Sequence, residues 1–202
     1  MQCIAKNIYV DSRMPTQQRQ EFLHIVSQSK DEISRFFGGM QSNPNIYACV
    51  SKACFSQFGG VPALAKAIGD NTVLLSSKAL NKVTLTHELA HVEFHKRLGS
   101  AKAWNKVPMW FDEGLAVLAC KDPKHNKPVT GIPLKSLTSQ SQWVNAVREQ
   151  LPAYSIAKQA VQSWYKTAGS RGLQSMISRM QKGDSFSSAL SLDSGLQRLS
   201  GL

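Results

Sequence analysis

The chain has 202 residues, 42% of them hydrophobic, which is enough to bury a core without help from disulfides or metals. Lysine and arginine number 24 against 13 acidic residues, a net charge of +11. These basic residues come singly or in pairs, not in blocks with interleaved aromatic residues. The spacing favours a generally basic surface over a nucleic-acid interface, and it leaves anionic membranes and acidic polymers open as partners.

No apolar run approaches the roughly 18 residues that a membrane span requires, so no transmembrane segment is expected. The first residues, MQCIAKNIYVDS, lack the charged segment and apolar stretch of a secretory leader. The expected location is therefore the cytoplasm by default, or outside it if a leader or anchor has been removed. The oligomeric state is left open.

The four cysteines leave the redox compartment open. Cys49 and Cys54 are close enough in sequence to bridge, whereas Cys3 and Cys120 show no pairing logic. A zinc site is not expected from this CxxxxC spacing, because no second Cys or His pair lies nearby. Reduced, buried cysteines and one Cys49–Cys54 disulfide are both compatible with the pattern.

The order of the predicted elements indicates an α+β fold. We expect a strand at 8–10, a helix at 15–37, a strand at 45–50, a loop with a helical turn at 51–71 (where Gly59-Gly60, Pro62 and Gly69 stand), a strand at 72–77 and a helix at 82–98. A helix from Pro108 through MWFDEGLAVLAC follows, then an irregular segment at 121–140, helices at 140–150, 153–168 and 171–182, and a short tail helix. This predicts one domain over 1–202, with the small mixed sheet in 1–99 and a mostly helical part in 100–202.

The segment THELAHVEFH contains the pattern HExxH on a predicted helix. His87 and His91 lie four positions apart, so both imidazoles can reach one metal ion from the same helix face. Glu88 lies about 100° round the helix, where its carboxylate can take a proton from a metal-bound water. The competing explanation is a chance pattern, expected about once in a hundred chains of this length. That explanation leaves two histidines and a glutamate on an otherwise apolar helix without partners.

A third ligand is needed if the fourth position is to hold water. His95 lies about 12 Å from His87 along a straight helix, so the two cannot share one ion, and His95 is expected either to contact the metal ligands or to lie at the surface. Glu113 is the better candidate, because it opens the next apolar helix, 22 positions after His91. The helix dipole alone would explain one acid at this helix start, but it explains the pair Asp112-Glu113 less well.

HELAH followed by WFDEGLA resembles the gluzincin zinc metallopeptidases, most of all the small bacterial peptidase-MA-like domains among them. The resemblance covers about residues 72–119 and is loose elsewhere. It implies a zincin-like α+β fold and a Zn²⁺ cofactor. The ligands it implies are His87, His91 and Glu113, with Glu88 as the general base.

Two features depart from the gluzincin pattern. The gap between His91 and Glu113 is a few residues longer than in the best-known families. Asp112 stands where an Asn is typical, and Val117 stands where the thermolysin type has an acid. The carboxylate that orients a ligand imidazole must therefore come from elsewhere, with Asp112 as a candidate.

Gluzincins usually add a Tyr or His that donates to the oxyanion, and Tyr154 is similar to the tyrosine found after the glutamate helix in related domains. A packing role for Tyr154 is equally compatible with its helical spacing; His125 and Tyr165 are weaker candidates. The implied function is peptide-bond hydrolysis, with a peptide or protein as substrate. The strand at 72–77 is the expected edge on which an extended peptide could pair.

Three other functions stay open. One is an inactive zinc-binding or metal-free interaction domain, although nothing in the motif is visibly broken. Another is a zinc amidase acting on a cell-wall amide, which the positive charge would suit. The last is a basic nucleic-acid-binding module, whose binding would fall steeply with salt.

Overall fold

The protein is described here from a computed structural model that covers residues 1–60 and 63–191. Pro62, part of the predicted loop, lies outside the described residues. The chain forms two compact units, Met1–Arg97 and a second unit that begins at Leu98. Within the described residues, no helix combines the length and the apolar character that crossing a bilayer would require.

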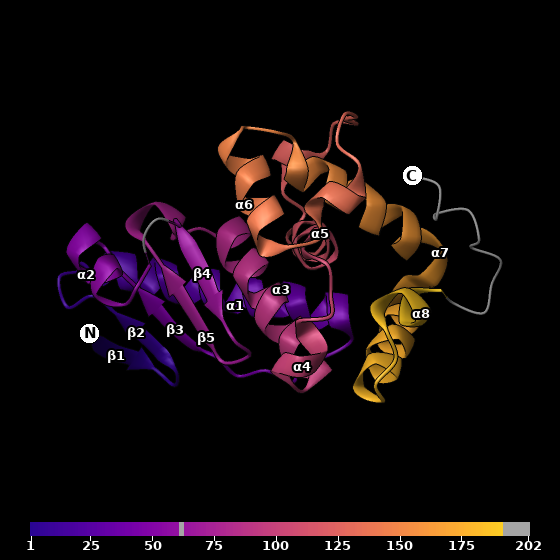
Figure 1. The fold of residues 1–202 in the computed structure, drawn as a ribbon. Helices are drawn as coiled ribbons and strands as arrows, with labels where there is room; N and C mark the ends of the chain where they lie inside the picture. The colour runs from indigo at the N-terminus through magenta and orange to yellow at the C-terminus, as the bar shows by residue number, and fades with distance from the viewer. Residues whose placement is uncertain (61–62, 192–202) are drawn as a thin grey trace. The chain divides into compact units, whose positions relative to one another are not determined.

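The first unit contains a five-stranded sheet (Figure 1). Its strands are β1 (Gln2–Ala5), β2 (Ile8–Val10), β3 (Asn45–Ala48), β4 (Ala65–Ile68) and β5 (Thr72–Leu75), in the spatial order β1-β2-β3-β5-β4. The three middle strands are parallel, and each edge strand pairs antiparallel with its neighbour. The prediction of a small mixed sheet in an α+β fold is therefore confirmed.

The edge of the sheet differs from the prediction. The strand expected at 72–77 is β5, which pairs with β3 on one side and with β4 on the other, so it offers no free edge. The outer strand is β4, which lies inside the segment predicted as a loop at 51–71. Its sequence, AKAI, holds a single β-branched residue and follows Gly59-Gly60. Pairing with β5, not local propensity, therefore defines this strand.

The two faces of the sheet are covered differently because side chains alternate along each strand. Ile8, Val10 and Ile46 point to one face and are buried. Tyr9 and Tyr47 point to the other, where their rings stack with centroids 5.0 Å apart. The short helix α2 (Lys52–Gln57) supplies Phe55 to the same cluster as Tyr47, and Phe58 at its end stacks on that tyrosine.

Two long helices belong to the first unit, α1 (Thr16–Phe37) and α3 (Lys82–Leu98). The 3-10 turn η1 (Ser77–Ala79) connects β5 to α3. The start of α3 is joined to α1, because Lys82 pairs with the buried carboxylate of Glu32 at 3.4 Å. Both helices match the predicted spans to within one residue, since their apolar residues recur at helical spacing.

The second unit is helical (Figure 1). Its elements are α4 (Ala101–Trp104), α5 (Met109–Cys120), η2 (Pro123–His125), η3 (Leu134–Leu137), α6 (Gln140–Arg148), α7 (Ala153–Gln181) and α8 (Phe186–Leu190). The helices predicted at 153–168 and 171–182 are both present in α7, which has a non-helical residue at Gly169 (φ 62°, ψ −167°). The tail helix corresponds to α8.

The core of the second unit lies where α5 meets α7. A Cβ atom on Gly114 would come within 2.4 Å of the Ala157 carbonyl oxygen, so the two helix backbones approach closely at this point. The ring of Phe111 makes edge contacts with Trp164 and Phe186, at centroid distances of 5.4 and 5.0 Å. This packing fixes the orientation of α5, the helix that carries Asp112 and Glu113.

Candidate metal centre

Helix α3 brings His87 and His91 together on one face. Their Nε2 atoms are 3.1 Å apart and their rings meet edge to face, with centroids 4.8 Å apart. Two imidazole nitrogens bound to one tetrahedral zinc at about 2.0–2.1 Å are separated by roughly 3.3–3.4 Å. His91 is buried and His87 is half-buried. The pair therefore fits the two-nitrogen part of a zinc site, as the HExxH pattern predicts.

Helix α3 carries three further polar residues near this pair, namely Glu88, His95 and Lys96. Glu88 is only 9% exposed, so little solvent reaches its side chain. His95 Nδ1 lies 3.2 Å from the carbonyl oxygen of Gly69, in the turn between β4 and β5. Lys96 pairs with Asp70 in the same turn at 3.3 Å. The last turns of α3 thus hold the β4–β5 hairpin.

A buried acid that the sequence analysis did not single out anchors α3 on its other side. Glu93 is fully buried, and its two carboxylate oxygens accept hydrogen bonds from the backbone N–H groups of Gln41 and Ser42. Arg97 donates to the same carboxylate at 2.6 Å and also to the carbonyl of Gly39. The sequence offered one signal for this network, because Glu93 and Arg97 lie four positions apart on a predicted apolar helix. This network fixes the segment before β3 against the helix that carries the histidines.

Glu113 and Asp112 lie near the start of α5, after Pro108, where the sequence predicted them. Both are half-buried. Their place on the helix follows from the local sequence, since proline favours a helix start and acids are stabilised near the helix N-terminus.

Tyr154 lies in the first turn of α7 and is half-buried. It stacks on the ring of His125, with centroids 5.5 Å apart, and meets Trp143 edge to face at 5.0 Å. His125 is held by the Ser155 hydroxyl, 3.0 Å from its Nδ1 atom. Burial raises the pKa of Tyr165, the other weak candidate. The structure therefore brings two of the three oxyanion-donor candidates, Tyr154 and His125, into contact.

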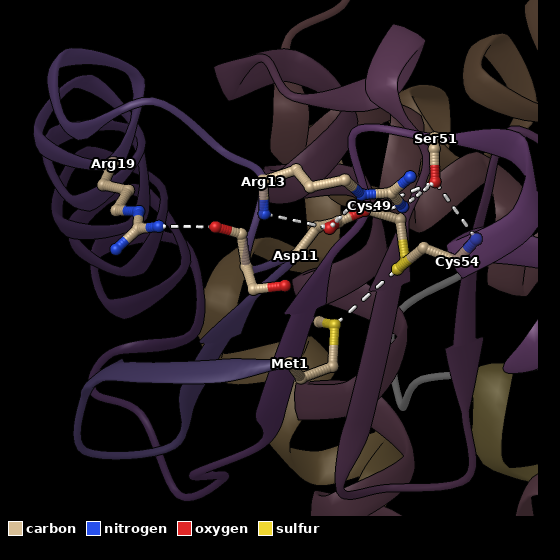
Figure 2. Close-up of polar contacts among 8 residues, drawn as sticks. Met1, Asp11, Arg13, Arg19, Cys49, Ser51 and Cys54 are labelled. Carbon is tan, nitrogen blue, oxygen red and sulfur yellow. Dashed lines mark hydrogen bonds and ion pairs between the residues drawn. A yellow bond between two sulfur atoms is a disulfide. The ribbon is translucent and has the colours of Figure 1, made fainter.

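A second polar cluster lies at the ends of β2 and β3 (Figure 2). Arg13 donates two hydrogen bonds to the buried Asp11 carboxylate, from Nε at 3.0 Å and from Nη2 at 2.8 Å. The Ser51 hydroxyl donates to the same carboxylate. The hydrogen bond from Arg13 is the main reason why the pKa of Asp11 falls to about 2. These contacts link the segment after β2, which carries Asp11 and Arg13, to Ser51 in the segment after β3.

Cys49 and Cys54 form a disulfide beside this cluster, with the Met1 sulfur 3.6 Å from Cys54 (Figure 2). Of the two possibilities left open for these cysteines, the structure shows the disulfide. Cys3 and Cys120 are free thiols, the first exposed and the second buried.

Comparisons with models of protein families, with curated proteins and with solved structures found no match to this chain.

Proposed function

We propose that the protein is a zinc-dependent metallopeptidase of the gluzincin type. His87, His91 and Glu113 would hold the ion; two imidazoles and one carboxylate are a donor set that could bind a metal. The observation that carries the proposal is the 3.1 Å approach of the two Nε2 atoms on α3.

The chemistry would be hydrolysis of an amide bond. A zinc ion held by these ligands would polarise the scissile carbonyl and lower the pKa of a bound water. The Glu88 carboxylate accepts the water proton and returns it to the leaving amine, a transfer that its low exposure favours because little solvent competes for the proton. The Tyr154 hydroxyl donates to the developing oxyanion.

The direct test replaces Glu88 by Gln, which removes the base and keeps the size of the side chain. The Glu88→Gln variant should bind zinc like the parent and lose cleavage of a mixed peptide library by roughly 100-fold or more. The matched control is Glu149→Gln at an exposed glutamate, which should cleave like the parent. Full cleavage by Glu88→Gln would contradict the role given to Glu88.

The net charge of +11 favours one variation on this function, an amide in an anionic polymer such as a cell wall. The same ligands and base would serve. Chelator-sensitive cleavage of such a polymer, with peptides left intact, would select this variation.

A further inference from the structure

Lys158 is a buried cation that the proposed mechanism does not use. The residue is only 5% exposed and lies in α7, one helical turn after Tyr154. Its ammonium group donates to the Asn126 side-chain oxygen at 2.5 Å. Across residues 1–60 and 63–191, no carboxylate forms an ion pair with it. Burying an ammonium group with only a neutral partner is costly, so the position calls for an explanation.

The surroundings of Lys158 offer further donors. An ammonium has three N–H bonds, and in the described part of the chain only the bond to Asn126 is used. Asn126 is exposed, and its amide nitrogen carries two more donors. The acid nearest to Asn126 in the sequence, Asp122, is already engaged, because its side chain accepts the N–H of Lys124 and lies 3.8 Å from His125. In the described part of the chain, Lys158 and Asn126 are therefore hydrogen-bonded to each other and both keep unused N–H donors.

The charge of the neighbouring segment has the same sign. Residues 121–127, KDPKHNK, carry three lysines and a histidine against one acid. α7 holds this segment in place through the contacts of Ser155 with His125 and of Lys158 with Asn126, and Gln159 holds Val129 just after it. A cationic segment over a buried ammonium attracts an anion.

We propose that Lys158 and Asn126 bind a carboxylate group of the substrate. This inference rests on the proposed function, in which Tyr154 donates to the oxyanion. Lys158 is four residues further along α7, about 6 Å along the helix axis. In the proposed arrangement the substrate peptide runs along α7 in extended form and advances about 3.3 Å per residue, so the carboxylate that Lys158 recognises would lie about two residues from the scissile carbonyl. It is either a free C-terminus or an acidic side chain at that position.

Binding to the zinc-loaded Glu88→Gln chain tests the inference without turnover. Four hexapeptides of one neutral sequence carry either Glu or Gln at one position and either a free or an amidated C-terminus. Isothermal titration should show about 10- to 100-fold tighter binding for peptides with the recognised carboxylate, the range for a hydrogen bond to a charged group. If the free C-terminus tightens binding, the recognised carboxylate is C-terminal; if Glu in place of Gln tightens binding, it is a side chain.

The variant Lys158→Met should remove this gain, and Lys166→Met, at an exposed lysine of the same helix, should keep it. Equal affinity for all four peptides, no binding of any, or a gain that survives in Lys158→Met would overturn the inference. Cleavage of all four at one rate by the parent would overturn it and leave the peptidase proposal standing. Carboxylate-dependent binding without any cleavage would overturn only the peptidase proposal.

Thermal unfolding separates recognition from a structural role. If Lys158 is buried at a cost in order to bind an anion, Lys158→Met should melt at the same temperature as the parent or higher. A melting temperature lower by several degrees, or failure to fold, would show that the lysine supports the fold and would contradict the inference.

Discussion

Replacing Glu93, which lies two residues after His91, should destabilise the first unit. Both carboxylate oxygens accept hydrogen bonds: Oε1 from Gln41 and Arg97, Oε2 from Gln41 and Ser42. In Glu93→Gln one oxygen becomes an NH₂ group, which faces an N–H donor in either orientation of the amide. Because the site is fully buried, we expect a loss of about 3–5 kcal/mol in the free energy of unfolding.

Urea unfolding followed by far-ultraviolet circular dichroism would give this free energy, and amide hydrogen exchange at Gln41 and Ser42 would localise the change. Both amides should be protected in the parent and exchange rapidly in Glu93→Gln. The control is Glu21→Gln, since Glu21 is exposed and accepts a hydrogen bond from the exposed Gln17 side chain. It should change stability by no more than about 0.5 kcal/mol. Equal stability of the two variants, with unchanged exchange, would refute this explanation of how α3 is anchored.

Three further changes have expected outcomes. Gly114→Ala should cost about 1–3 kcal/mol by overpacking although alanine favours helix, because the Ala157 backbone cannot move aside; a thermal melt no lower than the parent's would contradict the close approach. Asp11→Asn should remove a stabilisation that the parent has above about pH 4, because Arg13 lowers the folded-state pKa of Asp11 to about 2. The difference in unfolding free energy between the variant and the parent should therefore shrink between about pH 4 and about pH 2. A constant difference over this range would argue against the pairing of Asp11 with Arg13. Cys49→Ser should lower stability by about 2 kcal/mol under oxidising conditions, as expected for a loop of this length, and have little effect in reductant.

Helices were easier to predict from the sequence than strands, for a physical reason. The predicted helix at 82–98 has the same bounds as α3, because its apolar residues recur every three to four positions and Gly99 follows. The strand β4 was missed because its residues have little β preference and become a strand only by pairing with β5, which follows in the chain. The prediction that the strand at 72–77 forms the edge of the sheet was wrong for the same reason, because β4 covers that side of β5.

In the candidate site, too, local contacts could be predicted from the sequence and long-range contacts could not. The approach of His87 to His91 followed from a spacing of four on one helix, which is local information. The partners of Glu93 lie 51 and 52 positions earlier in the chain, and Asn126 lies 32 positions before Lys158. Such contacts depend on the tertiary arrangement and leave no pattern in the sequence.

Zinc stoichiometry tests the central proposal most directly. After loading with excess zinc and dialysis against zinc-free buffer, elemental analysis should find one zinc per chain in the parent and in Glu88→Gln, and a large loss in His91→Ala and in Glu113→Ala. A parent chain without stoichiometric zinc, or a His91→Ala variant that keeps it, would contradict the proposed metal centre.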